Sequence, residues 1–244
     1  WEEDGRTATF WWRDDDAADH TDALNELLLL RTALGVPLAL AVIPATATSE
    51  LRAALDQGNA IAVLQHGYSH TNFAGPDERK IELDGSRPAT YVIGDLATGL
   101  QAMERFAGFV PVMVPPWNRI APHLIPFLPE LGFRGLSTLG PRNRPSPVAG
   151  LNANNVHLDV IDWRGHATGT AGSFRGGEAI LADAVAHLAA RRTGAADADE
   201  ATGLMTHHAV MKTDSKEFVR QFVDHTNQHP ASQWLSAEEV FPTP

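Results

Sequence analysis

Polar side chains that could carry chemistry occur in five short clusters along the chain. They are Asp14–Asp16, the pair His66 and His70, Pro116–Asn118, Asp162 with Trp163, and His207 with His208. Each cluster comes directly after a run of residues that predicts a strand. Because the carboxyl ends of parallel strands meet at one edge of a sheet, this common position indicates a single functional site.

His66 and His70 are four residues apart, a spacing at which two imidazoles can face one metal ion. The spacing alone is weak evidence, because the chain has 11 histidines and a second pair, His225 and His229, has the same spacing. That second pair lies in an expected C-terminal helix, far from any strand end, so we interpret it as surface. The first pair follows an apolar strand, and this position favours a metal site.

Three adjacent aspartates, Asp14–Asp16, follow the first expected strand. A solvated turn that caps the next helix would explain them. Successive side chains at a strand end also diverge, so one carboxylate could bind a metal while another stays free as a base. With the two histidines they form an Asp–His–His set that suits one divalent ion: zinc, iron, cobalt or nickel. Beside such a site His207 is a candidate general acid, and His208 is its rival.

Seven expected strands position these clusters. They are Ala8–Trp12, Leu38–Ile43, Ile61–Leu64, Val110–Val114, Leu136–Leu139, Val156–Ile161 and Leu204–Thr206. Helices are expected between them, among them Thr21–Leu34, where Thr21 is the N-cap and Gly35 ends the helix. Repeated strand–helix alternation predicts a parallel sheet. Because no linker divides the chain, residues 1–244 are expected to form one domain, a distorted (β/α) barrel, with an open doubly wound sheet as the alternative.

Composition narrows the class of protein. The chain is 43% hydrophobic, which disfavours disorder, and its formal net charge of -11 disfavours nucleic acid as a partner. It contains no cysteine, which excludes a thiol nucleophile and a cysteine zinc site. No apolar run approaches the roughly 18 residues of a membrane helix, so no membrane partner is expected. The ligand is expected to be neutral, cationic or small, whereas cellular location and oligomeric state stay open.

The order of the clusters resembles the motifs of the polysaccharide deacetylase family, also called the NodB-homology or carbohydrate esterase family 4 fold. The family pattern T-F-D-D-G is matched by Trp12–Asp16, and H-[ST]-x-x-H by His66–His70. The patterns R-x-P-Y, D-W and L-x-H are matched by Val114–Asn118, Asp162-Trp163 and Met205–His207. Each motif is weak by itself, but together they span nearly the whole chain in the right order.

The resemblance implies a barrel of about seven parallel strands and a metal-dependent hydrolase that removes an N-acyl group, preferentially N-acetyl, from a carbohydrate. The implied ligands of one divalent metal, zinc in the first place, are Asp15, His66 and His70. Asp14 is then the base that deprotonates a metal-activated water. His207 protonates the leaving amine, and Asp162 orients His207.

The resemblance also implies how the substrate is held. Trp117 is expected to offer a backbone N–H to the oxyanion, and Trp163 to wall the acyl pocket. The substrate-binding residues expected on this match are Trp117, Pro116, Asn118, Trp163 and Arg13.

The match departs from the family pattern in the first and third motifs. Val114 stands where the family has an arginine that braces the base, and either Arg13 or Arg119 could substitute for it. Asp16 replaces the usual glycine, and a register shifted by one residue would make Asp15 the base and Asp16 the ligand. These departures indicate a divergent member of the family.

Two other functions stay open. The same fold and much of the same site could hydrolyse another C–N bond, as in a cyclic amide or a formamide. A non-catalytic protein that binds carbohydrate or a partner is suggested by Val114. However, a buried Asp/His cluster is costly unless something occupies it. The sequence therefore favours an N-acetylated sugar as the substrate, with another small amide as the alternative.

Overall fold

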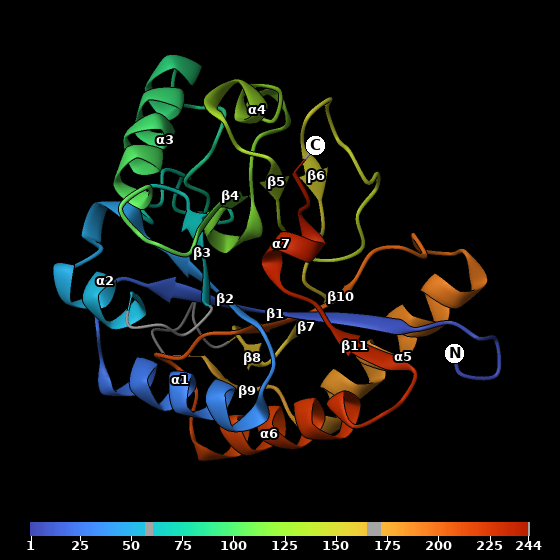
Figure 1. The fold of residues 1–244 in the computed structure, drawn as a ribbon. Coiled ribbons are helices and arrows are strands. Elements are labelled where there is room, and N and C mark those ends of the chain that lie inside the picture. The colour runs from blue at the N-terminus through green and yellow to red at the C-terminus, as the bar shows by residue number, and fades with distance from the viewer. Residues whose placement is uncertain (57–60, 165–171, 244) are drawn as a thin grey trace.

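A computed structural model of the chain describes residues 1–56, 61–164 and 172–243, in which strands and helices alternate (Figure 1). The strands are β1 (Ala8–Ala17), β2 (Leu38–Val42), β3 (Ile61–His66), β4 (Phe109–Val114), β5 (Gly135–Leu136), β6 (Asn152–Ala153), β7 (Leu158–Asp159), β8 (Ile161–Asp162), β9 (Ser173–Phe174), β10 (Thr202–Thr206) and β11 (Ser232–Trp234). The α-helices are α1 (Asp22–Leu34), α2 (Ser49–Leu55), α3 (Ala89–Met103), α4 (Phe127–Leu131), α5 (Gly177–Thr193), α6 (Thr213–Asn227) and α7 (Ala237–Val240).

The strands form one parallel sheet in the order β6-β5-β4-β3-β2-β1-β10-β7, and β11 pairs with the first residues of β1. Beyond β5, Leu139 makes a parallel bridge to Val156, which lies just before β7. This bridge joins the β5 end of the sheet to the β7 end, so the sheet is curled into a barrel and not left open. The prediction of a distorted (β/α) barrel of about seven parallel strands is confirmed.

Helices cover both sides of the sheet. Figure 1 shows α1 and α6 side by side along one side, and α3 with α4 on the other. Helix α1 begins after Thr21, whose side chain accepts a hydrogen bond from the Leu24 N–H, and ends at Gly35 with a φ of 66°. Both predicted ends of this helix are confirmed. In the part of the chain that the structure describes, no helix is both long and apolar enough to cross a membrane.

The two faces of β1 pack in different apolar clusters, because successive side chains of a strand point to opposite sides. Phe10 and Trp12 pack with α1 and α6, whereas Trp11 packs in a second cluster that α7 also joins. By this alternation Asp14 lies on the same face of β1 as Phe10 and Trp12, and Asp15 lies on the same face as Trp11. Two neighbouring carboxylates therefore enter different surroundings.

Several predicted boundaries are wrong. The strand expected to end at Trp12 continues to Ala17, because the charged residues that follow are paired within the barrel. The strand expected over Val156–Ile161 is divided into β7 and β8, and β8 pairs with β9 in a separate antiparallel hairpin. Strands β6, β9 and β11 and helix α7 were not expected, because two to four residues give too little periodicity to recognise.

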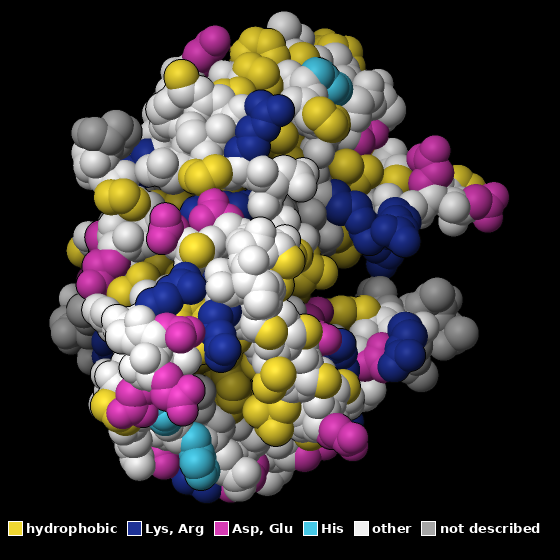
Figure 2. Space-filling view, turned by 90° about the vertical axis from the view of Figure 1, so that its right-hand side faces the viewer, with side chains coloured by type: hydrophobic (Ala, Val, Ile, Leu, Met, Phe, Trp, Pro, Cys, Tyr) yellow, Lys and Arg dark blue, Asp and Glu magenta, His cyan; other side chains and the backbone are white. Residues whose placement is uncertain are grey.

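Charge is mixed on the surface face shown in Figure 2, where acidic side chains lie among basic ones.

Candidate active site

A β-bulge aims the aspartates of β1. Asp14 pairs with Leu40 and Ala17 pairs with Val42, so β1 advances three residues while β2 advances two. Asp16 lies in this bulge with a φ of 70°, in the left-handed region that few residues other than glycine adopt. Because a bulge redirects side chains, Asp16 does not follow the simple alternation of the strand.

The bulge brings Asp16 to His66 and His70. One carboxylate oxygen of Asp16, Oδ1, is 3.0 Å from His66 Nε2 and 3.2 Å from His70 Nε2. The three side chains offer ligand atoms close enough together to hold one metal ion. His66 lies at the end of β3, and its Nδ1–H donates to the carbonyl oxygen of Val114 at 2.9 Å. This bond directs the other ring nitrogen toward Asp16.

Electrostatics keep Asp16 anionic. Burial would raise the pKa of Asp16, but hydrogen bonds with His66 and His70 outweigh it and hold the pKa well below its ordinary value. Burial likewise opposes the charged form of His66, yet the hydrogen bond with Asp16 raises its pKa. The cluster therefore favours a negative oxygen facing positive charge, whether that charge is a proton or a metal ion.

The turn between His66 and His70 is stabilised by hydrogen bonds to the side chain of Glu82. This carboxylate is buried and accepts hydrogen bonds from the N–H groups of Tyr68 and Ser69, at 3.2 and 2.7 Å. Gly67 has a φ of 55°, and a Cβ at this position would lie 2.1 Å from Glu82 Oε2 and 2.6 Å from Pro116 Cδ. Only glycine fits this backbone without displacing its neighbours.

Gly67→Ala is therefore expected to lower the thermal unfolding temperature and to weaken metal binding. The left-handed backbone costs alanine about 1–2 kcal/mol, and overpacking adds about 1–3 kcal/mol. The unfolding temperature should fall on the order of 10 °C, as measured by calorimetry. Gly94→Ala is the matched control, because a Cβ at this helical glycine meets nothing within 4 Å. Equal unfolding temperatures for the two variants would contradict this account.

Asp15 pairs with Arg13 and lies apart from the histidine pair. The guanidinium donates from Nε to Oδ1 and from Nη2 to Oδ2, both at 2.8 Å, and both side chains are buried. Arg13 also donates to Ser137 Oγ at 2.7 Å and to Asn118 Oδ1 at 2.6 Å. Arg119, in contrast, is bonded to the carbonyl oxygen of Lys80. Val114 stands where the family has an arginine. Arg13, and not Arg119, is the arginine that pairs with an aspartate of this site.

Asp14 lies on the other face of β1 and contacts the turn after β10. Its carboxylate is fully buried and is bonded to Thr206 Oγ1, His208 N and His208 Nδ1. Burial lowers the pKa of His208, but the Asp14 carboxylate outweighs this and raises it. The arrangement expected from the motif match, with Asp15 beside the histidines and Asp14 free as a base, is not the one observed. Asp16, the ligand of the register shifted by one residue, is the aspartate that lies with His66 and His70.

His207 stands at the edge of the Asp16 cluster. Its Nε2 is 4.0 Å from Asp16 Oδ2, and its ring meets Trp163 edge-on with centroids 4.7 Å apart. Asp162, expected to orient His207, instead pairs with Arg164 at 2.5 Å, and this partner lowers the pKa of Asp162 to about 2. Asp162 lies in the β8–β9 hairpin, opposite Ser173, and not in the parallel sheet that carries β7.

Asp159 is a partly buried carboxylate near His207 that the motif pattern does not indicate. Its oxygens accept hydrogen bonds from Ile161 N at 2.9 Å and Trp163 Nε1 at 3.0 Å. Burial raises the pKa of Asp159, and the nearby charge of His207 opposes that rise. Its position at the end of the short strand β7 is the sequence signal for it, although the D-W pair of the motif lies three residues later.

The segment after β4 adds the remaining side chains of the predicted site. Trp117 and Asn118 have φ values of 54° and 57°, and buried Pro116 precedes them. The Trp117 ring lies against His70 with centroids 4.4 Å apart, and Asn118 is held by Arg13. The structure therefore brings Trp117, Asn118 and Arg13 to the same edge as the histidine pair.

A second cluster of possible ligands, His157, His187 and Glu200, does not have the geometry of a metal site. The two imidazole rings are stacked with centroids 3.5 Å apart, so their in-plane lone pairs run side by side and do not converge. The Gly203 N–H also donates to His157 Nδ1, which leaves the ring proton on Nε2, facing Glu200. We interpret this cluster as two histidines that surround a buried carboxylate.

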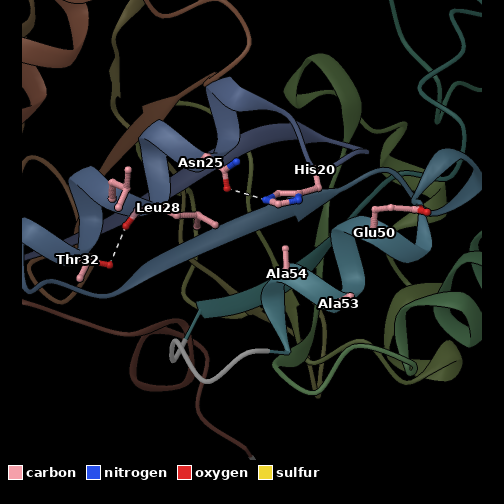
Figure 3. A pocket seen from close by; sticks show the side chains of 8 residues that line it. His20, Asn25, Leu28, Thr32, Glu50, Ala53 and Ala54 are labelled. Carbon is pink, nitrogen blue, oxygen red and sulfur yellow. Dashed lines mark hydrogen bonds between the residues drawn. The ribbon is translucent and has the colours of Figure 1, made fainter.

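Two surface hollows differ in their relation to the site. One, of about 510 Å³, lies between α1 and α2, where His20 is hydrogen-bonded to Asn25 (Figure 3). None of its lining residues belongs to the five motif clusters. The other, of about 620 Å³, is lined by Asp159, Asp162 and Trp163, and therefore lies beside His207.

Comparison with known proteins agrees with this fold. No family model matches the sequence, and no curated protein sequence matches it. Among solved structures, a Mycobacterium smegmatis protein assigned as a polysaccharide deacetylase has a TM-score of 0.71 at 20% identity, covering 96% of this chain and 88% of that one. Puue allantoinase has a TM-score of 0.65 at 12% identity, with coverages of 96% and 88%. A family 4 acetyl xylan esterase from Clostridium thermocellum, in complex with a cobalt ion, has a TM-score of 0.57 at 12% identity, with coverages of 96% and 90%.

The chain has the fold of the polysaccharide deacetylases and family 4 carbohydrate esterases. The resemblance drawn from the motif order is thereby confirmed for the fold.

Proposed function

We propose that this chain is a metal-dependent hydrolase that removes an N-acetyl group from a sugar, with residues 1–244 as one catalytic domain. The observation that carries the proposal is the meeting of Asp16, His66 and His70, with His207 4.0 Å from Asp16 and Asp15 next to Asp16 in β1. These side chains lie at the edge of a barrel whose fold is shared with deacetylases.

The three side chains fit a divalent metal. Because His66 Nδ1 donates to a carbonyl oxygen, the neutral ring has a lone pair at Nε2, and that lone pair faces a carboxylate oxygen 3.0 Å away. Two acceptors at this distance need a cation between them. A carboxylate and two imidazoles suit zinc, and also cobalt, nickel or iron. When bound, the metal would lower the pKa of a water and polarise the substrate carbonyl.

Asp15 is the proposed base, in the register that the geometry favours. Arg13 holds its carboxylate in one orientation through two parallel hydrogen bonds. Asp15 accepts the proton of the attacking water as the oxygen adds to the carbonyl carbon. The backbone N–H of Trp117 is proposed to stabilise the oxyanion.

His207 is the proposed acid. It gives its proton to the leaving nitrogen as the C–N bond breaks, so the products are acetate and a free amine. Asp159 is proposed, in place of Asp162, as a positioning carboxylate for His207, because it interacts electrostatically with that ring and binds the indole of Trp163, which the ring contacts. Trp163, Pro116 and Asn118 would line the substrate site.

Hydrolysis of another small amide is the second candidate. It is supported by the structural likeness to an allantoinase. The loss of the arginine at Val114, with Arg13 as its replacement, also agrees with a changed substrate.

Metal content and acetate release test the proposal together. The protein without a histidine tag should hold about one zinc or cobalt ion per chain, measured by mass spectrometry. His66→Ala/His70→Ala should lose the ion, whereas His225→Ala/His229→Ala, on exposed residues of the C-terminal region, should keep it. The metal-loaded protein should release acetate from N-acetylglucosamine oligomers.

The other outcomes separate the candidates. Bound metal without acetate release, but with hydrolysis of a cyclic amide, would favour the second function. Failure to bind zinc or cobalt after incubation with either would overturn the catalytic proposal.

A further inference from the structure

Asp14 and His208 are buried titratable side chains that the proposed reaction does not use. The Asp14 carboxylate accepts three hydrogen bonds: from Thr206 Oγ1 at 2.6 Å, His208 N at 3.0 Å and His208 Nδ1 at 2.5 Å. All three donors come from the residues directly before and after His207.

The His207 ring has little to hold it by itself. Within the described residues its Nδ1 is buried without a hydrogen-bond partner, its Nε2 is 4.0 Å from Asp16 Oδ2, and its ring meets Trp163 edge-on. The His207 carbonyl oxygen accepts hydrogen bonds from the N–H groups of Val210 and Met211. The direction of the ring therefore depends on the backbone of its own turn, and that turn is bonded to Asp14 on both sides of His207.

We infer that Asp14 is a positioning residue, whose carboxylate ties the turn Thr206–His208 to β1 and so sets the place of His207 relative to Asp15 and Asp16. The inference rests on the proposed role of His207 as the acid.

The strand register makes this tie short and rigid. Asp14 lies opposite Thr206 in the pairing of β1 with β10, one residue before Asp15 and two before Asp16. Thr206 Oγ1 accepts a hydrogen bond from Trp12 Nε1, so its own proton is directed to Asp14. Asp14 thus links the turn that carries the proposed acid to the strand that carries the proposed base and metal ligand.

Asp14→Asn and Thr206→Val test the inference. Both keep the shape of the side chain, and both weaken the tie without removing a proposed metal ligand. Thr202→Val is the matched control, because Thr202 is a buried threonine at the other end of the same strand and is bonded to His187 and Arg191. The wild-type protein and these three variants are compared with zinc bound.

Each test variant is expected to keep its zinc and to lower kcat for acetate release from N-acetylglucosamine oligomers. The loss should be about tenfold to a hundredfold with KM nearly unchanged, because a displacement on the order of 1 Å has such an effect. Thr202→Val should lose similar thermal stability and keep kcat within about twofold. An equal loss of kcat in Thr202→Val would reduce the role of Asp14 to general stability.

A readout without substrate separates this inference from the proposed function. Long-range ¹H–¹⁵N spectra of the histidine rings report the surroundings of His207, assigned by comparison with His207→Gln. The His207 signals should shift or broaden in Asp14→Asn and Thr206→Val and stay in place in Thr202→Val. Unchanged His207 signals in both test variants would overturn the inference, even if the wild-type protein deacetylates its substrate. Shifted signals would uphold the tie even if no acetate is released.

Discussion

Asp16→Asn is expected to abolish metal binding, whereas Asp15→Asn is expected to keep the metal and stop the reaction. Asp16 Oδ1 is the oxygen that faces both imidazoles, and an amide in its place is a poor ligand. Asp15 is hydrogen-bonded to Arg13 and belongs to no group of metal ligands among the described residues, so Asp15→Asn removes the proposed base, a contribution of about 10²–10⁴-fold in rate. Metal content and the rate of acetate release are measured on the same preparations.

The comparison also decides the register of the aspartates. Loss of metal in Asp15→Asn, with metal kept in Asp16→Asn, would restore the unshifted match in which Asp15 is the ligand. Asp77→Asn, an exposed aspartate in a turn, controls for the change of charge and should alter neither quantity.

Arg13→Met is expected to lower the free energy of unfolding by about 3–5 kcal/mol, because it leaves the Asp15 carboxylate buried without its partner. The double variant Arg13→Met/Asp15→Leu should recover most of that loss, since it removes both charges. Arg13→Lys should not rescue, because an ammonium cannot make the two parallel bonds of the guanidinium. Urea denaturation of the metal-free proteins gives these free energies.

A surface pair gives the control for this prediction. Arg220 and Glu217 are paired on the exposed face of α6, and Arg220→Met should change the free energy of unfolding little. A double variant less stable than Arg13→Met would show that the pair itself stabilises the fold, contrary to this account.

The barrel could be predicted because its longer elements have clear patterns. Local sequence is enough to predict β2 from its apolar run. It also predicts both ends of α1, from the capping Thr21 and from Gly35 at the end of the helix. The order of five weak motifs then supplied the architecture. Two-residue strands such as β6 and β7 have no such pattern, and their pairing depends on residues far away in the chain.

The different partners of Asp14, Asp15 and Asp16 could not be predicted from the sequence. A run of four charged residues after Trp12 has the composition of a turn, and only the barrel reveals that each charge has a partner. The bulge that brings Asp16 to the histidines depends on how β1 pairs with β2. Choosing Asp159 over Asp162 likewise needs the hairpin that follows β7.

The bulge in β1 also limits how this site can change by descent. Three consecutive carboxylates enter three different surroundings, so inserting or deleting one residue would reassign all of them together. Lineages that retain the site should therefore diverge by substitution on either side of it and keep the length of this strand constant. In an alignment of such lineages, a gap opened between Arg13 and Ala17 would pair each aspartate with a neighbour of different function.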